Sequence, residues 1–217
     1  MDLNMDLTDW VSCDSHAVSW QTNADDNVAR CFLEQAEGGL HSTVVGKFPA
    51  GFKLPPHPHP GGEEVFVLEG SFFDADGEYP AGSYLRLPRG WVHSTETPGG
   101  CTLFVKVGQV PAEDSTRVHL ASDDHDFKEV FPGLRRRVLH EFGDEQVFLI
   151  RFEPGVTADH HVHTGGEELY IIEGDLADDR GHYTAGSWLR FPDGSAHTPH
   201  SPSGCLMFVK RGHLSGS

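Results

Sequence analysis

The sequence predicts an all-β protein built from two similar domains. The chain matches itself at a constant offset of 104 residues, with 27 of 59 positions identical between 48–106 and 152–210. It is also rich in turn residues, with 25 Gly and 14 Pro among 217 residues, and has no long stretch of helical periodicity. These observations indicate a duplicated unit of short strands and turns.

The expected elements follow the same order in both repeats. Runs rich in β-forming residues lead into each histidine cluster, at 41–48 and 146–152. Strands that end at a glycine then follow, at 63–70 and 167–174. Strands broken by Pro and Gly come next, at 82–90 and 186–194, and closing strands end each unit, at 101–107 and 205–211. Turns are expected at 74–82 and 178–186. This spacing favours an antiparallel sandwich or small barrel in each repeat.

The domain boundaries follow from the repeat. We expect an N-terminal arm at 1–19, a first domain at 20–112, and a linker with the second domain at 113–217. The joint is the polar segment between Gly108 and Phe127. The arm either packs on a neighbouring domain or subunit or forms a disordered tail. We expect the two repeats to pack as one rigid body, and further homodimerisation through sheet edges stays open.

Composition restricts the partners. The net charge of −17 is shared as −9 up to Ala112 and −8 afterwards, so both halves should repel a phosphate backbone and nucleic acid is not an expected partner. No apolar run is long enough to cross a bilayer, and a cytoplasmic location is the default expectation. The four cysteines form no CxxC pair, and Cys101 and Cys205 begin equivalent apolar runs, as small buried strand residues do.

Two copies of one histidine pattern carry the chemistry. The segments "PPHPHPGGEE" (55–64) and "DHHVHTGGEE" (159–168) each place two histidines at i and i+2, which share one face of a strand. The Gly-Gly turn returns a glutamate beside them, and a third histidine follows a Pro-x-Gly turn. The predicted metal ligands are His57, His59, Glu63 and His93 in the first repeat and His161, His163, Glu167 and His197 in the second. Three imidazoles and one carboxylate suit Fe, Mn, Ni, Co or Zn.

Other polar and aromatic residues receive structural interpretations. Glu64 and Glu168 should face away from the metal by strand alternation and form hydrogen bonds or salt bridges. Arg86 and Arg190 are expected to pair with Glu69 and Glu173 or a domain-interface carboxylate, with an anionic ligand as the alternative. Three aromatic residues are expected in the core rather than at a pocket mouth: Trp91, Trp188 and Tyr84. Three histidines that occur only in the second repeat are expected at the surface or around the site: His160, His182 and His200.

The spacing of these residues resembles the cupin superfamily. The motif G-x5-H-x-H-x3-E-x6-G fits Gly51–Gly70 and Gly155–Gly174, and the motif G-x5-P-x-G-x2-H fits from Gly82 to His93 and from Gly186 to His197. The Asn that ends the second motif is replaced by Thr97 and Ser201, but that position is not a metal ligand in the family. The resemblance implies two tandem double-stranded β-helix (cupin jelly-roll) domains, a bicupin, each holding one divalent metal. Zn and Fe are the leading expectations, with Mn and Ni as alternatives.

More narrowly, residues 61–106 resemble the cupin-like domain of ChrR, a zinc-binding anti-sigma factor. Anti-sigma factors of that kind carry an N-terminal helical domain with its own His/Cys zinc site. Fewer than about fifty residues precede the first motif here, without such a cluster, so we do not expect sigma factor binding.

Three classes of function stay open at this stage. A metal-dependent dioxygenase or related enzyme would use coordination positions left open beside the four ligands for a small oxygen-containing molecule. A zinc-binding regulatory or sensor protein would saturate the metal and catalyse nothing. In a third class the metal only stabilises the sandwich. Metal identity and coordination number distinguish the first two, and no separate nucleophile or acid/base pair stands out in the sequence.

Overall fold

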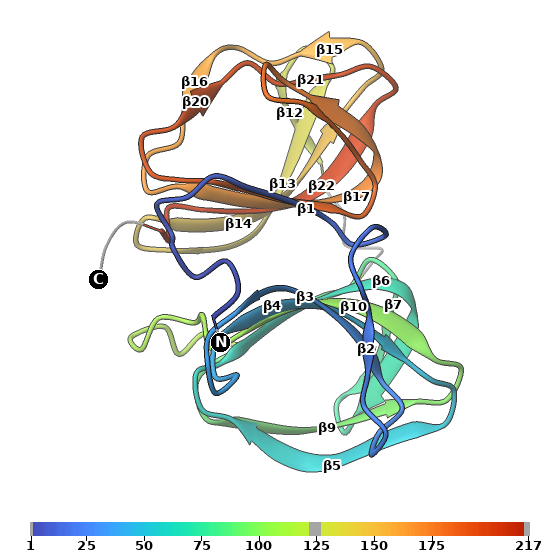
Figure 1. The fold of residues 1–217 in the computed structure, drawn as a ribbon. Coiled ribbons are helices and arrows are strands. Elements are labelled where there is room, and N and C mark those ends of the chain that lie inside the picture. The colour runs from blue at the N-terminus through green and yellow to red at the C-terminus, as the bar shows by residue number, and fades with distance from the viewer. Residues whose placement is uncertain (1, 122–126, 215–217) are drawn as a thin grey trace. The chain divides into compact units, whose positions relative to one another are not determined.

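The computed structural model describes residues 2–121 and 127–214, so residues 122–126 of the predicted joint lie outside the described chain. Within the described residues all regular structure is β, and none of it is a helix that could span a membrane. The chain forms two compact units, one of residues 2–5 and 19–121 and the other of residues 6–18 and 127–214. The prediction of an all-β chain with two repeated domains is confirmed, and the units show the curled double sheets of a jelly roll (Figure 1).

The first unit contains a large sheet and a smaller facing wall. Its strands are β2 (Gln21–Thr22), β3 (Ala29–Gln35), β4 (Ser42–Phe48), β5 (Phe52–His59), β6 (Glu63–Asp74), β7 (Gly77–Pro80), β8 (Tyr84–Leu87), β9 (Trp91–Thr97), β10 (Cys101–Val107) and β11 (Val118–Leu120). The large sheet has the order β11-β8-β6-β10-β4-β3-β2. In Figure 1, β5 and β9 form the wall that faces β3, β4 and β10.

The second unit repeats this arrangement. Its strands are β1 (Val11–Asp14), β12 (Lys128–Phe131), β13 (Leu134–Phe142), β14 (Glu145–Phe152), β15 (Val156–Thr157), β16 (His161–Val162), β17 (Glu167–Ala177), β18 (His182–Thr184), β19 (Ser187–Phe191), β20 (Ala196–His197), β21 (His200–Ser201) and β22 (Cys205–Arg211). The large sheet has the order β1-β19-β17-β22-β14-β13-β12, and β16 pairs with β20.

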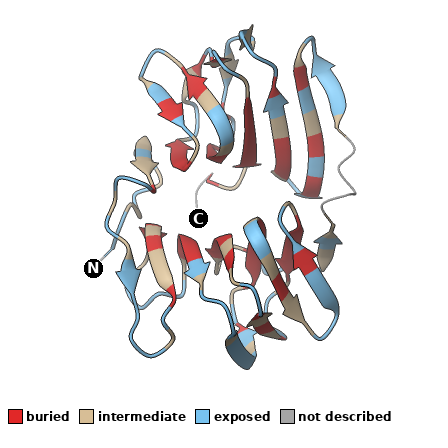
Figure 2. Cartoon of the chain, turned by 90° about the vertical axis from the view of Figure 1, so that its right-hand side faces the viewer, coloured by how far each residue is buried: buried red, intermediate tan, exposed pale blue. Residues whose placement is uncertain are grey.

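Each unit has its own apolar core. The strands of the large sheets carry most of the buried residues, while the connecting segments are largely exposed (Figure 2). In the first core Val67 and Leu85 are fully buried, and in the second Ile171 and Leu189 are. Cys101 and Cys205 are buried in these cores without disulfides, as the sequence predicts.

One edge strand of each large sheet comes from a chain segment that precedes the other repeat. The N-terminal strand β1 pairs with β19 of the second unit, with Val11 opposite Arg190. The strand that precedes the second repeat, β11, pairs with β8 of the first unit, with Val118 opposite Arg86. Each large sheet therefore takes its edge strand from the segment that precedes the other repeat.

One detail of the predicted strands is wrong. The long strands were expected to end at Gly70 and Gly174, but β6 and β17 continue to Asp74 and Ala177. These glycines, at φ +71° and +75°, mark the corner where the strand leaves the large sheet and joins the second wall. A Cβ there would collide with the carbonyl oxygen of Gly100 or Gly204, so the corner requires glycine. The predicted turns at 74–82 and 178–186 accordingly contain the short strands β7 and β18.

Candidate metal centres

The first histidine cluster lies where β5, β6 and β9 meet. The register sets His57 directly opposite His93, and His59 follows two residues after His57. Burial alternates along β9 and turns His93 inward, as the period of two in a strand requires. The turn at Gly62, with φ +75°, then delivers Glu63 as the first residue of β6.

The donor atoms of this cluster converge. The Nε2 atom of His59 lies 3.0 Å from the Nε2 atoms of both His57 and His93. The Oε2 atom of Glu63 lies 3.5 Å from Nε2 of His59 and 3.5 Å from Nε2 of His93. Two ligands about 2.1 Å from one ion and at right angles to each other are about 3.0 Å apart. The spacing of the three nitrogens is therefore that of neighbouring ligands around a metal.

The second repeat assembles the equivalent cluster. His161 on β16 lies opposite His197 on β20, and one ring nitrogen of each of His161, His163 and His197 lies within 4.8 Å of the others. Glu167 begins β17, and its Oε1 atom is 3.9 Å from Nε2 of His163. The structure thus brings together all eight predicted residues in two groups of four, and their role as metal ligands stays a prediction.

Hydrogen bonds fix the proton on the outer nitrogen of each histidine in the second repeat. Nδ1 of His161 contacts the carbonyl oxygen of Asp159 at 2.9 Å, and a carbonyl only accepts, so Nδ1 carries the proton. Nδ1 of His197 donates to Oδ2 of Asp178 at 2.8 Å. The Ser195 hydroxyl donates its proton to a backbone carbonyl, so at 3.1 Å it accepts from Nδ1 of His163.

The inner nitrogens consequently present three lone pairs to one point. Nε2 of His163 has no hydrogen-bond partner among the described residues. In the first repeat, Nδ1 of His57 donates to the carbonyl of Pro55 at 3.0 Å, which leaves its Nε2 as a lone pair too. If Nε2 of His59 carries a proton, it can donate a hydrogen bond to Nε2 of only one of the two neighbouring histidines, His57 or His93. Converging lone pairs repel each other unless a cation lies between them, and a borderline divalent ion matches this donor set.

Burial favours the neutral form of His59, His163 and His197, as metal binding requires. Desolvation, together with repulsion from His197 and His161, lowers the pKa of His163 to about 3. Desolvation also lowers the pKa values of His59 and His197. Burial raises the pKa of Glu167 to about 7, although Arg211 acts in the opposite direction. Without a cation, the second site therefore disfavours charge on His163, on His197 and on the carboxyl of Glu167.

The sequence analysis missed the carboxylate behind the third histidine. Asp178 accepts from His197 and is held by the backbone N–H groups of Arg180 and Gly181. The equivalent Asp74 in the first repeat lies farther from its histidine, with 4.0 Å between Oδ2 and Nδ1 of His93. Identity in both repeats was the available signal, but the surrounding segment was assigned only to a turn. Carboxylates in this position orient a ligating imidazole and raise its basicity.

The acidic neighbours of the ligands take the expected structural role. Glu64 contacts Arg86 at 2.7 Å and Glu168 contacts Arg190 at 2.7 Å, so the prediction of outward salt bridges is confirmed. The expected partners of the arginines were wrong in part. Glu69 instead accepts a hydrogen bond from Thr102, and Glu173 lies 3.7 Å from Arg151. Strand alternation explains the difference, because Glu64 and Arg86 are cross-strand neighbours.

The aromatic and histidine candidates mostly lie outside the sites. Tyr84 and Trp188 are fully buried in the large sheets, as expected, whereas Trp91 is half-buried beneath Arg117. His160 is exposed and contacts Thr198 at 3.1 Å, and His182 contacts Asp175 at 2.6 Å. The half-buried His200 belongs to β21 and pairs with Thr157.

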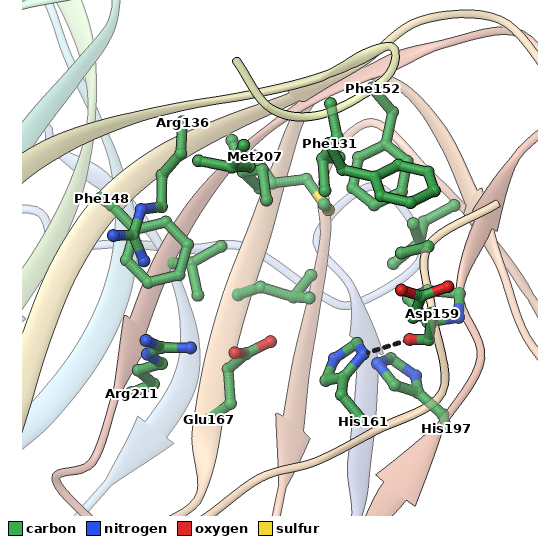
Figure 3. A pocket seen from close by; sticks show the side chains of 18 of the residues that line it. Phe131, Arg136, Phe148, Phe152, Asp159, His161, Glu167, His197, Met207 and Arg211 are labelled. Atoms are coloured by element: carbon green, nitrogen blue, oxygen red, sulfur yellow. Dashed lines mark hydrogen bonds between the residues drawn. The ribbon is translucent and has the colours of Figure 1, made fainter. Parts of the chain in front are cut away.

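The second histidine cluster opens onto a cavity of about 510 Å³ inside its own unit. Figure 3 shows His161 and His197 at one end of this cavity, Arg136 and Arg211 at the other, and Glu167 between them. The remaining wall is largely apolar, formed by Phe131, Leu134, Phe148, Ile150, Phe152, Leu169, Leu176, Met207 and Val209. This volume is typical of sites for small organic molecules.

The chain belongs to a known family of cupins. The family described as the ChrR cupin-like domain matches twice, over residues 8–111 and 115–215, which nearly covers the chain. The two matches correspond to the two repeats and confirm the bicupin organisation. No curated protein matches the sequence.

Solved structures support the same fold. A proposed dioxygenase from Nostoc punctiforme superimposes with a TM-score of 0.80 at 17% identity, over 97% of this chain and 85% of that chain. A proposed glyoxylate-induced protein from Pseudomonas aeruginosa gives 0.72 at 15%, over 96% and 90%. Oxalate decarboxylase from Lactobacillus farciminis, in its formate complex, gives 0.66 at 12%, over 93% and 86%. At these identities the likeness shows the bicupin fold alone.

Proposed function

We propose that the protein is a metal-dependent bicupin enzyme that binds and converts a small oxygen-containing molecule at the His161, His163, Glu167 and His197 centre. The observation that carries this proposal is the position of the donor cluster on the wall of the 510 Å³ cavity. A cluster that served only to stabilise the sandwich would need no such space beside it. Fold similarity to a proposed dioxygenase and to oxalate decarboxylase is consistent with this proposal.

The protein's own residues would divide the work between holding the ion and receiving the ligand. His161, His163 and His197 would hold the ion through Nε2, because Asp159, Ser195 and Asp178 engage the opposite nitrogens. Glu167 would supply the fourth donor and offset one positive charge. A divalent ion bound there supplies Lewis acidity and, if it is iron, redox chemistry with O₂. The apolar wall would exclude bulk water and strengthen the attraction for an anionic or enolate-like oxygen ligand.

The test begins with elemental analysis of protein purified without added metal. Metal-free protein is then loaded with Fe(II) without oxygen and mixed with a β-diketone such as acetylacetone or with a hydroxyketone. We expect a charge-transfer band, followed by oxygen uptake once air is admitted. The variant His57→Ala/His59→Ala, which retains only the second centre, should keep both signals. Zinc held by four protein donors without exchangeable water, and no spectral change with any such ligand, would contradict the proposal and support the regulatory function.

A further inference from the structure

The cavity beside the second metal centre contains two arginines at the end away from the histidines. The guanidinium carbon of Arg136 lies 5.2 Å from the ring centroid of Phe148, and that of Arg211 lies 5.5 Å from the same centroid. Both arginines line the cavity together with the predicted metal ligands His161, Glu167 and His197 (Figure 3). The cavity therefore has two polar ends, one cationic and one formed by metal donors.

The positive charge at this end is only partly balanced within the described residues, since Arg211 acts on the carboxyl of its cross-strand neighbour Glu167 without forming an ion pair with it. Arg211 donates to Oε1 of Gln146 from Nε at 2.8 Å, and Gln146 is neutral. Among residues 2–121 and 127–214, neither Arg136 nor Arg211 lies within ion-pair distance of a carboxylate. The two arginines come from the strands on either side of β14, and both guanidiniums lie near the Phe148 ring, so an anion that reaches both would relieve their mutual repulsion.

The first repeat provides a built-in comparison. Arg30 pairs with Gly46 in the register in which Arg136 pairs with Ile150, so the two arginines occupy equivalent strand positions. Arg30, however, is neutralised by Asp26, with contacts of 2.7 and 3.2 Å. By the repeat offset of 104, Val107 corresponds to Arg211 and Val44 to Phe148. Within the part of the chain that the structure describes, a pair of arginines without an ion pair around an aromatic ring is thus a feature of the second repeat.

The space between the two ends suits an apolar ligand body. Phe152, Leu176 and Met207 are buried side chains of the lining. Val130 and Phe131 also line the cavity and remain 53% and 38% exposed. An apolar ligand would cover them and gain the corresponding hydrophobic free energy.

We propose that the second repeat binds an organic acid, whose carboxylate contacts Arg136 and Arg211, whose apolar body packs on Phe148 and Phe131, and whose other oxygen atoms face the metal centre. This inference rests on the proposed function and narrows its substrate class from any small oxygen-containing molecule to a carboxylic acid with an aromatic or branched aliphatic body. The arginines act here as binding and specificity residues. Arg136 lies away from the predicted metal ligands, whereas Arg211 is the cross-strand neighbour of Glu167.

The experiment compares two catechols that differ only at the end expected to meet the arginines. Dihydrocaffeate carries a carboxylate on its ethyl side chain, and ethylcatechol carries none; both offer two oxygens to a metal. Binding is measured by calorimetry without oxygen, on zinc-loaded His57→Ala/His59→Ala protein, so that only the second centre reports. We expect dihydrocaffeate to bind at least about 10-fold more tightly than ethylcatechol, as charge-assisted hydrogen bonds to two guanidiniums allow.

Variants of Arg136 and Arg211 test whether these residues cause the preference for dihydrocaffeate over ethylcatechol. Arg136→Gln or Arg211→Gln should remove most of the preference for the acid, expressed as the ratio of the two affinities. The zinc content of each variant, measured separately, shows whether the metal site is intact. Arg136→Lys should retain part of the preference, and the matched control Arg30→Gln all of it. Equal affinity for the two catechols in the parent protein, or a preference that survives both glutamine variants, would overturn the inference while the proposed function stands. If neither catechol binds more tightly with zinc than without it, the proposed function fails as well.

Discussion

The two repeats share their predicted metal ligands but differ in what surrounds them. In the second repeat Asp178 lies 2.8 Å from Nδ1 of His197, whereas in the first Asp74 lies 4.0 Å from Nδ1 of His93. Ser195 accepts from His163, and the residue at its place in the first repeat is Trp91. The donor set was thus retained after duplication while its supports diverged.

The walls beside the two centres differ further. The second repeat presents Arg136, Arg211 and Phe148 to its cavity, where the first has a neutralised Arg30, Val107 and Val44. Residues that would hold an ion are constrained by its coordination, so they tolerate little change. Residues that would meet a ligand are free to change with the ligand. The comparison therefore makes the second repeat the one in which the proposed ligand specificity would lie.

The largest expected effect is the loss of one metal from either repeat. His57→Ala/His59→Ala and His161→Ala/His163→Ala should each lower the metal content from two ions per chain to one, since each removes half of a donor set. Elemental analysis of fully loaded protein measures the ratio. A wild-type content of one ion per chain would break the comparison, because the two clusters would then not be equivalent metal sites.

A large effect is also expected when the buried carboxylate of the second centre is neutralised in metal-free protein. The pKa of Glu167 is raised from 4.5 to about 7, so the folded state holds the proton better than the unfolded state does. Stability is consequently lost as pH rises from about 4.5 through 7, by up to about 3 kcal/mol. Glu167→Gln should remove this loss and stabilise the chelated protein at pH 8 but not at pH 4.

Urea unfolding at both pH values, with a chelator present throughout, measures the effect. Glu63→Gln, analysed in parallel, shows whether the change is confined to the second repeat. An unfolding midpoint of Glu167→Gln that follows the wild type between pH 4 and 8 would mean that the Glu167 carboxyl is not desolvated in the folded protein.

The supporting aspartates should give unequal effects. Asp178→Asn should weaken metal binding at the second centre about 10- to 100-fold, because the amide no longer supplies a charged acceptor to His197. Asp74→Asn should have a smaller effect, since Asp74 does not reach hydrogen-bond distance of His93. Competition with a chromophoric chelator gives both affinities. Equal losses in the two variants would show that the difference between 2.8 and 4.0 Å has no energetic consequence.

The smallest expected effect concerns Ser195. Ser195→Ala removes the acceptor that fixes Nδ1 of His163 but leaves every predicted ligand in place. One neutral hydrogen bond contributes about 1 kcal/mol, so the metal affinity of the second centre should fall about fivefold. The same chelator competition measures it. An unchanged affinity would indicate that packing alone holds the His163 ring.

The sequence by itself determined the fold class, the duplication and the two donor sets. These features are encoded locally: the i and i+2 histidines share a strand face, and glycine turns bring Glu63 and Glu167 back beside them within a few residues. The third histidine required one hairpin pairing, which places His93 opposite His57 and His197 opposite His161. The rule that a glycine ends a strand was wrong at Gly70 and Gly174, because these glycines form a bend within β6 and β17, which continue beyond them.

Only the tertiary structure decided what surrounds the donors. Arg136 and Arg211 are 75 residues apart in the chain, and both lie near Phe148 because β13 and β22 both pair with β14. Asp178 reaches His197 only after β17 has bent through Gly174, and Val11–Asp14 joins a sheet formed by residues more than a hundred positions later. None of these contacts leaves a periodic or spacing signal in the sequence, since the partners are selected by strand order and register, which the long-range packing of the two sheets determines.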